Sequence, residues 1–319
     1  MKLISFEDYQ EFVSKFKEVE VEDQKIKLEQ IEVDRLEPSP EELTDVSTTV
    51  WSFPKRGAWA THKGDYRGNW PPQMARALIL RYTKLGETVL DPMVGSGTTA
   101  IEAKLLGRNC IAVDIELGAV MLTLHRLYYL EKALKRPRIT EEIGETSVED
   151  IEKSRVKVFH GDARKLDLIE DESVDLIATH PPYFNIIRYG SEGNISIMRK
   201  LEDYLKALEE IARECYRVLK KGGHMAMLIG DTRIHKHYVP ISHYVLDRFM
   251  NAGFILAEEV VKIQHKMKTT REVWGKMKER DFLLIFHEKL FIFRKPEEES
   301  ELKKFKYSRM VRKDAEDKK

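Results

Sequence analysis

The sequence lacks several features that define large classes of protein. Only two of its 319 residues are cysteines, Cys110 and Cys215, and both lie far apart in apolar stretches. Neither a disulfide framework nor a cysteine metal site is expected from such spacing. No apolar run is long enough to span a bilayer, and the first residues lack the apolar core of a signal peptide. We therefore expect a cytoplasmic protein with no membrane partner and no metal.

The formal net charge of the sequence is zero. The 54 Lys and Arg residues balance the 54 Asp and Glu residues, which argues against a large, uniformly basic surface for nucleic acid. A local basic patch remains open. Asn and Gln are scarce while Lys and Glu are abundant, a composition typical of hyperthermophile proteins, where ion-pair networks replace labile amides.

From Thr88 onward, apolar runs of strand length alternate with amphipathic stretches of helix length. This alternation predicts an α/β fold with a mainly parallel sheet. Seven strands are expected, and they cover residues 88–93, 110–115, 156–162, 174–180, 223–231, 254–263 and 281–295. Around them we expect a charged N-terminal extension over 1–50, an aromatic-basic loop and helix over 51–85, an α/β domain over 86–295, and a charged tail over 296–319.

The segment "LDPMVGSGTTAIEA" follows the first of these strands and opens a helix. Gly95 and Gly97 allow a tight turn and a close approach to a ligand. A dinucleotide-binding protein would place pyrophosphate at such a helix N-terminus. Here Asp91 stands ahead of the glycines, where its charge would repel a phosphate and favour an ammonium or a sulfonium.

Two further acids end the next two strands, Asp114 in "AVDIE" and Asp162 in "HGDARKL". Each alone is more often a helix N-cap. Three acids at successive strand ends converge on one crevice at the carboxyl edge of a parallel sheet. They favour an adenosine with a cationic tail, namely S-adenosylmethionine. The expected cofactor-binding residues are Asp91, Pro92, Gly95, Ser96, Gly97, Thr98, Thr99, Asp114, Asp162 and Ala163.

The third feature is the corner "THPPYF", in which Pro181 and Pro182 follow a buried strand. Proline cannot donate to a sheet ladder, so a proline pair ends the strand. Taken alone, the corner is as well explained by a simple strand-ending turn.

Together, "DPMVGSGTT", "THPPYF" and "HKGDYRGNWPPQMARALI" resemble the S-adenosylmethionine-dependent amino-methyltransferases that act on exocyclic amines of nucleobases. The likeness covers about residues 60–295. It implies a Rossmann-like methyltransferase fold, with a mainly parallel seven-stranded sheet, helices on both faces and a small N-terminal extension. The segment before the loop would close over the methionine end of the cofactor. We expect an archaeal, RNA-acting cytosine member.

The resemblance implies that His180, Pro181, Pro182 and Tyr183 form the catalytic corner. The lone pair of a nucleobase amine is conjugated with its ring, so the site must draw the amine hydrogens toward fixed acceptors. The carbonyl of Pro181 and the side chain or carbonyl of His180 would be those acceptors. Tyr183 would stack on a base taken out of its helix.

His180 departs from the family, whose cytosine members usually carry serine there and whose adenine and guanine members carry aspartate or asparagine. The missing carboxylate and a second aromatic, Tyr189, favour cytosine. Asn185 and Arg188 are expected to contact the base or its phosphate, although both also suit an ordinary loop.

No separate target-recognition region is visible beyond a basic stretch over 262–280 that contains Trp274. Such a patch can hold phosphates and stack a base, and it suits an unpaired base in a structured RNA. RNA is therefore favoured over DNA, with ribosomal RNA as the first choice. A DNA cytosine-N4 or adenine-N6 methyltransferase, a guanine or adenine methyltransferase of transfer RNA, and a non-catalytic binding module remain as alternatives.

Overall fold

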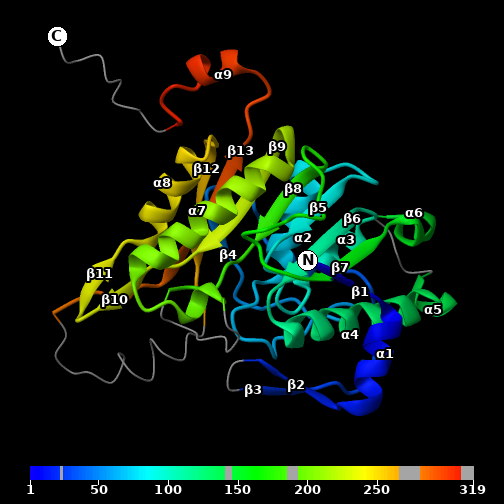
Figure 1. Cartoon of the computed structure of the whole chain (residues 1–319). Coiled ribbons are helices and arrows are strands. Elements are labelled where there is room, and N and C mark those ends of the chain that lie inside the picture. Colours follow the sequence, from blue (N-terminus) through cyan, green and yellow to red (C-terminus); the bar gives the residue numbers. More distant parts are fainter. Residues whose placement is uncertain (22–23, 141–145, 185–192, 266–280, 310–319) are drawn as a thin grey trace, which may run out of the picture.

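The computed structural model describes residues 1–21, 24–140, 146–184, 193–265 and 281–309. Its centre is a nine-stranded sheet with the order β1-β7-β6-β5-β8-β9-β13-β12-β4 (Figure 1). In sheet order the strands are β1 (Lys2–Ile4), β7 (Val156–His160), β6 (Asn109–Asp114), β5 (Thr88–Asp91), β8 (Val174–Thr179), β9 (Leu219–Ile229), β13 (His287–Arg294), β12 (Ile255–Ile263) and β4 (Val50–Ser52). The seven expected strands are the seven in the middle.

The strand order explains where a ligand can enter. From β5 in the middle, the chain moves outward through β6 to β7 and then returns to β8 on the other side of β5. Strands β5 to β9 are all parallel, and β13 runs antiparallel between β9 and β12. The point where the order reverses, between β5 and β8, opens a crevice at the carboxyl ends of the strands.

The expected count of seven strands was too low, because the N-terminal segment adds both edge strands. Strand β1 pairs antiparallel with β7, and β4 pairs parallel with β12. Between them lie α1 (Phe6–Lys15), the hairpin β2 (Glu18–Val21) and β3 (Gln24–Lys27), and a short 3₁₀ turn η1 (Pro40–Glu42). The Tyr9 hydroxyl is hydrogen-bonded to His125 at 2.7 Å. The extension is therefore packed into the fold.

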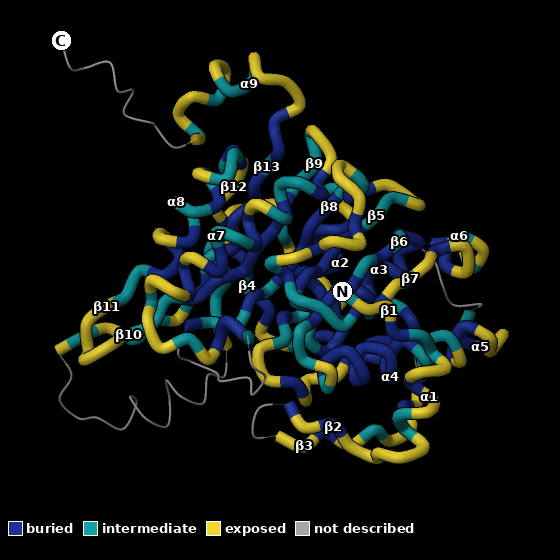
Figure 2. The backbone as a smooth tube through the Cα atoms, viewed as in Figure 1, coloured by how far each residue is buried: buried dark blue, intermediate teal, exposed yellow. Residues whose placement is uncertain are grey.

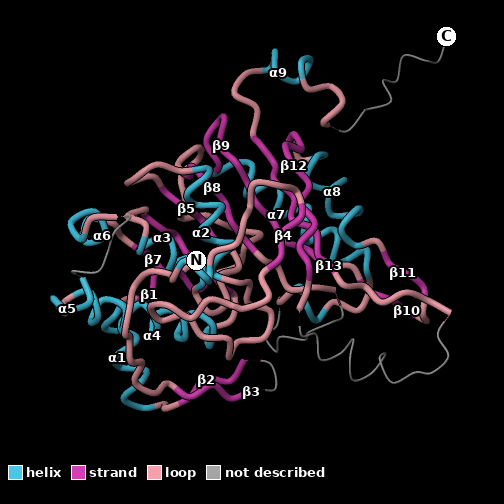
Figure 3. Tube along the Cα trace, turned by 180° about the vertical axis from the view of Figure 1, so that it is seen from behind, coloured by secondary structure: helices cyan, strands magenta, loops and turns pink. Residues whose placement is uncertain are grey.

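Side chains alternate along the strands and build one apolar core on each face of the sheet. In β5, Val89 packs in one core and Leu90 in the other. On the Val89 face lie α2 (Pro72–Tyr82), α3 (Thr98–Leu105) and α4 (Leu117–Leu134); on the Leu90 face lie α7 (Leu201–Val218) and α8 (Ile241–Asn251) (Figures 1 and 3). Both Cys110 and Cys215 are buried free thiols, as expected.

The smaller elements lie at the periphery, where Figure 2 shows mostly exposed backbone. They are α5 (Pro137–Thr140), α6 (Val148–Lys153), the hairpin β10 (Thr232–Ile234) and β11 (His237–Val239), and α9 (Glu299–Lys304). The 3₁₀ turn η2 (Ile195–Ile197) is instead largely buried. The charged tail was expected to be solvated, and α9 is mostly exposed. It is nevertheless held to the sheet, because Arg294 pairs with Glu301 at 2.7 Å and the Leu256 amide donates to the Ser308 carbonyl at 2.8 Å. Within the described ranges, every helix is too short or too polar to cross a lipid bilayer.

The core on the Leu90 face should carry a large share of the stability. Phe249 is fully buried and stacks on Phe293, with ring centroids 5.3 Å apart. We expect Phe249→Ala to lower the free energy of unfolding by about 3–5 kcal/mol, through lost transfer energy and a cavity. Denaturant unfolding measures this change. Leu168→Ala, at a side chain that is 58% exposed, is the control, and equal losses in the two variants would contradict the assignment.

Candidate active site

A pocket lies at the carboxyl edge of the sheet, where the strand order reverses. Ten of the predicted site residues line it: Asp91, Pro92, Gly95, Ser96, Thr98, Asp114, Asp162, Ala163, His180 and Pro182. The structure therefore brings the cofactor loop, the three acids and the proline corner together.

The glycine loop is tied to the sheet through Asp91. Its two carboxylate oxygens accept from the hydroxyls of Thr99 at 2.6 Å and Thr179 at 2.8 Å, which joins β5, α3 and β8. Gly97 stands at the N-cap of α3 with φ of 87°, a conformation that costs glycine little. Burial raises the pKa of Asp91 to about 6, so its negative charge faces the pocket at neutral pH.

Asp114 holds the other side of the loop. Its carboxylate accepts from the Gly95 amide at 2.8 Å and from the Glu116 amide at 2.9 Å. Burial raises the pKa of Asp114 to about 7. The carboxylate is thus available to hydroxyl donors only when the pH is near or above neutral.

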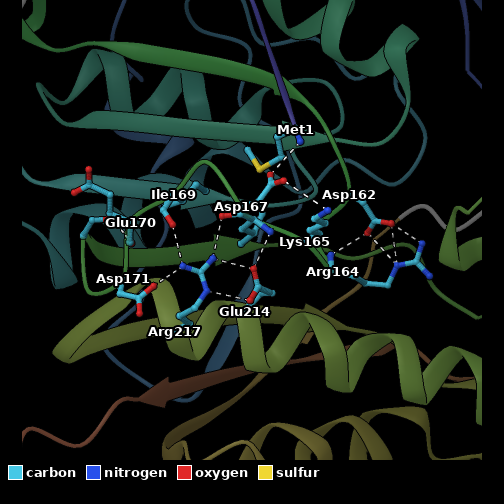
Figure 4. A network of polar contacts seen from close by, with 12 residues as sticks. Met1, Asp162, Arg164, Lys165, Asp167, Ile169, Glu170, Asp171, Glu214 and Arg217 are labelled. Carbon is cyan, nitrogen blue, oxygen red and sulfur yellow. Dashed lines mark hydrogen bonds and ion pairs between the residues drawn. The ribbon is translucent and has the colours of Figure 1, made fainter.

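Asp162 also lines the pocket, but its carboxylate is not free as the sequence suggested. Arg164 donates to both oxygens, at 3.0 Å from Nε and 2.5 Å from one terminal nitrogen. Figure 4 shows the surrounding network, in which Arg217 of α7 binds the Leu166 and Ile169 carbonyls and pairs with Glu214. This network fixes the loop after β7 that carries Asp162.

The segment 51–70 forms a wall of the pocket through Tyr66, Gly68, Asn69 and Trp70. It is fixed by the fully buried carboxylate of Glu102 on α3. Glu102 accepts from Trp59 Nε1 and His62 Nε2, both at 2.7 Å, and pairs with Arg76 of α2 at 3.2 Å. Burial alone would raise the pKa of Glu102, yet His62 and Arg76 hold it below its ordinary value.

Two buried arginines lie behind the same wall. Arg56 donates to the Trp70 carbonyl at 2.5 Å, and burial lowers its pKa to about 10. Arg126 of α4 donates to the Ser96 carbonyl at 2.9 Å and pairs with Asp65. The Arg56 Nε atom is buried and makes no hydrogen bond within the described part of the chain. The guanidinium groups of Arg56 and Arg126 therefore place positive charge next to the glycine loop.

The proline corner follows β8 directly. Pro181 is buried, and the Pro182 carbonyl accepts from the Tyr204 hydroxyl of α7 at 2.9 Å. This bond occupies the Pro182 carbonyl and fixes the direction of the corner. Nothing in the sequence pattern marked Tyr204 for this role, since its spacing on α7 only indicated a core position.

His180 stands between the corner and the wall. Its ring stacks on Trp70 with centroids 6.2 Å apart, and its Nε2 atom lies 2.6 Å from the Tyr183 hydroxyl. Desolvation lowers the pKa of His180 to about 4, so the imidazole is neutral at physiological pH. Tyr183 is not among the residues that line the pocket, and its hydroxyl is anchored to Glu288 at 2.5 Å.

The predicted substrate residues Asn185, Arg188, Tyr189 and Trp274 lie outside the described residues. Of the basic stretch over 262–280, Lys262 is described, and it is not a surface cation. Its side chain is 13% exposed and pairs with Glu288 at 2.7 Å. The interpretation of Lys262 as a phosphate contact was therefore wrong.

The acidic residues fit S-adenosylmethionine. Asp91 and Asp114 at the ends of β5 and β6 suit a sulfonium and ribose hydroxyls, while Arg56 lies within the segment expected to cover the carboxylate end. Glu116 and Asn194 also line the pocket, and Asn194 Nδ2 donates to Glu116 at 2.8 Å. These two were missed because Glu116 lies two residues after the strand acid Asp114 and Asn194 lies in an irregular segment.

Comparison with known families gives two matches. The sequence profile of the N6/N4 methyltransferase family, described as DNA methylase, matches residues 4–124 and 174–319. The profile of the RMKL-like methyltransferase domain matches residues 65–238. The first match includes the glycine loop, the proline corner and the final strands.

Two relatives are by name a type II methyltransferase and a transfer RNA methyltransferase. Type II methyltransferase M2.MboI of Moraxella bovis is 34% identical over 86 residues, which are 27% of this chain and 32% of the relative. A tRNA (guanine(10)-N2)-dimethyltransferase of Methanothermobacter thermautotrophicus is 29% identical over 185 residues, 58% of this chain and 44% of the relative. The chain thus spans less than half the length of these curated relatives.

Among solved structures, a SAM-dependent methyltransferase from Methanosarcina mazei overlaps 69% of this chain and 97% of its own. The sequence identity is 16% and the TM-score is 0.42. Because this score is below 0.5, the fold assignment depends on the strand order described above.

Glu102 should support both the fold and the pocket. We expect Glu102→Gln to lower the free energy of unfolding by about 3 kcal/mol, because Arg76 then loses its buried charge partner. Affinity for S-adenosylmethionine should fall as the 51–70 segment loosens. Denaturant unfolding and calorimetric titration measure both effects. Glu11→Gln, at an exposed helix pair, should change neither quantity.

The pKa of Asp114 makes cofactor binding depend on pH. Ribose hydroxyls need an ionised acceptor, so affinity for S-adenosylmethionine should be constant well above pH 7. Below that value it should weaken by up to about tenfold per pH unit. Titrations at pH 8 and pH 6 test this. The Asp114→Asn variant should bind S-adenosylmethionine weakly, and its affinity should change less between pH 8 and pH 6 than that of the wild type. Equal wild-type affinity at the two pH values would refute the role of Asp114.

Proposed function

Because the chain belongs to the DNA methylase family, we propose that it methylates the exocyclic amine of a nucleobase, using S-adenosylmethionine. Cytosine N4 in a structured RNA is the favoured target. One observation carries this proposal. His180 and Pro182 of the proline corner line the same pocket as Asp91 and Asp114 of the cofactor loop.

The cofactor half would use residues that already converge. Asp114 would accept from the ribose hydroxyls, the loop carrying Asp162 and Ala163 would face the adenine, and Asp91 would face the positive charge. S-adenosylmethionine supplies an electrophilic methyl group on its sulfonium. The wall that contains Tyr66 and Trp70 would cover this part of the pocket.

The catalytic half would act by fixed acceptors. A backbone carbonyl needs no reorganisation to accept an amine hydrogen. The Pro182 carbonyl is engaged by Tyr204, so the Pro181 carbonyl is the better candidate. Tyr204 and the proline pair would together keep that carbonyl aimed at the amine, and alignment would supply much of the rate.

The choice of cytosine rests on the residue at position 180. A neutral histidine, with a pKa lowered to about 4 by desolvation, replaces the aspartate or asparagine that adenine and guanine members carry. It presents no carboxylate to the base. This is closer in charge to the serine of cytosine members.

The choice of RNA is supported by the architecture. The described strands and helices after the corner complete the sheet and its covering layers, apart from the small hairpin β10–β11. Among the described residues, little chain is left for reading a long duplex site, whereas an unpaired base in a shaped RNA needs less surface. Ribosomal RNA is favoured because one dedicated position requires shape more than sequence.

A second candidate is the guanine amine of transfer RNA. The match to the tRNA (guanine(10)-N2)-dimethyltransferase covers 58% of this chain, compared with 27% for the type II DNA enzyme. Transfer to a DNA amine is the third candidate, supported by the family profile.

Methyl transfer from labelled S-adenosylmethionine separates the candidates. We expect label in ribosomal RNA, and N4-methylated cytidine after digestion and nucleoside mass spectrometry. Label in transfer RNA with methylated guanosine would favour the second candidate, and label in genomic DNA alone would overturn the RNA proposal.

Pro182→Ala is the matched catalytic control. It should lower transfer by about 100-fold because the acceptor carbonyl is no longer aimed, while its affinity for S-adenosylmethionine stays close to that of the wild type. A wild-type protein that binds the cofactor and labels no nucleic acid would overturn the proposal.

A further inference from the structure

A chain of polar side chains continues from the proline corner into the sheet, beyond the pocket. His180 Nε2 lies 2.6 Å from the Tyr183 hydroxyl, which donates to Glu288 Oε1 at 2.5 Å. The other carboxylate oxygen of Glu288 pairs with Lys262 at 2.7 Å. Lys262 and Glu288 are direct partners in the register of β12 and β13, so the chain ends on two rigid strands.

Charge decides the direction of these hydrogen bonds. Burial alone would raise the pKa of Glu288, but Lys262 and His180 hold it below its ordinary value. The ionised carboxylate only accepts, so the single hydroxyl hydrogen of Tyr183 points to Glu288. The Tyr183 oxygen must then accept from His180, which places the proton of the neutral imidazole on Nε2.

The other nitrogen of His180 is enclosed. Its Nδ1 atom is buried and makes no hydrogen bond of normal geometry within the described residues, although the Gly68 backbone lies beside the ring. Trp70 stacks on the same ring. Nε2 is therefore hydrogen-bonded and Nδ1 is enclosed. The imidazole packs between the 51–70 segment and Tyr183.

The ring of Tyr183 is fixed as well. Gly230, directly after β9, is so close that an added Cβ would meet the ring at 2.6 Å. One face of the ring therefore lies on the backbone of Gly230, and its hydroxyl is held by Glu288. Only a residue without a side chain leaves room for this position.

We propose that Lys262 and Glu288 are positioning residues for the target base. By holding the hydroxyl of Tyr183, they set the plane on which the base stacks and the orientation of His180 at the start of the proline corner. This inference rests on the proposed function. We call Tyr183, Glu288 and Lys262 the clamp. The groups that face it are His180 after β8 and the uncharged Gly68 and Trp70 of the 51–70 segment, which lie beside His180.

The test removes the buried pair as a unit. Lys262→Met/Glu288→Met takes away both charges together, which avoids leaving one buried and unpaired. We expect kcat for methyl transfer to the nucleic acid that the wild type labels to fall by about 100-fold. The Kd for S-adenosylmethionine should stay within about twofold of the wild-type value, because neither residue lines the cofactor pocket.

The same strands offer a matched control. Glu259 of β12 and Lys289 of β13 form a second cross-strand pair at 2.8 Å, and Lys289 follows Glu288 directly, so it faces the other side of the sheet. Glu259→Met/Lys289→Met should leave kcat unchanged. Tyr183→Phe alone should match the loss of the Lys262/Glu288 variant, and combining the two should add little further loss. Additive losses, or equal loss in the control, would overturn the inference.

Gly230→Ala is a second variant in case the double substitution unfolds the chain. Its Cβ would displace the Tyr183 ring without touching the charged pair. It should lower kcat while the melting temperature and cofactor affinity stay near wild type. Full activity in a folded Gly230→Ala protein would also overturn the inference.

One readout is independent of activity. In ¹⁵N-histidine NMR spectra of the cofactor-free protein at pH 7, His180 should carry its proton on Nε2. In the Lys262/Glu288 variant the Tyr183 hydroxyl loses its carboxylate acceptor and should donate to Nε2 of His180, so the imidazole proton should move to Nδ1. A wild-type proton on Nδ1 would refute the clamp even if methyl transfer occurs. A wild type with the Nε2 proton but no transfer to any nucleic acid would refute the proposed function, and with it the role of the clamp.

Discussion

The buried carboxylate of Glu102 is the interaction on which the pocket depends. A charge in the middle of a helix face is costly to bury unless donors surround it. Trp59 and His62 donate to it from the 51–70 segment, and Arg76 pairs with it from α2. One residue of α3 therefore ties an otherwise irregular segment to the helix that the glycine loop begins. Together with the bonds of Arg56 to the Trp70 carbonyl and of Arg126 to Asp65, this tie holds Tyr66 and Trp70 on the pocket wall.

The two halves of the pocket differ in charge: one carries ionisable carboxyl groups and the other carries neutral polar groups. The cofactor half carries buried acids whose pKa values are raised by burial, to about 6 for Asp91 and about 7 for Asp114. Such groups attract a cationic ligand because its charge stabilises their ionised forms. The proline corner instead presents a neutral histidine and backbone carbonyls. A site that aims an amine at a sulfonium needs this contrast, since a charged acceptor beside the amine is unnecessary when fixed dipoles can draw its hydrogens.

The family match and the geometry define the reaction type more closely than they define the target base. The match to the DNA methylase family includes the glycine loop and the proline corner, and one relative is by name a transfer RNA methyltransferase. The match therefore supports methyl transfer without naming the target base. In this chain the clamp formed by Tyr183, Glu288 and Lys262 adjoins the proline corner and is anchored in the sheet. We propose that it links the position of the target base to the catalytic corner.

The sequence by itself determined the alternating α/β order, the glycine loop, the three acids and the proline corner. Each of these depends on residues close together in the chain, where periodicity and turn chemistry are decisive. The tertiary structure decided which distant residues meet them. Pairing of β1 and β4 with the sheet edges, the grip of Tyr204 on Pro182, and the burial of Lys262 against Glu288 all join segments far apart in sequence. A lysine in a basic stretch looks like a surface cation until the register of β12 and β13 places a buried carboxylate opposite it.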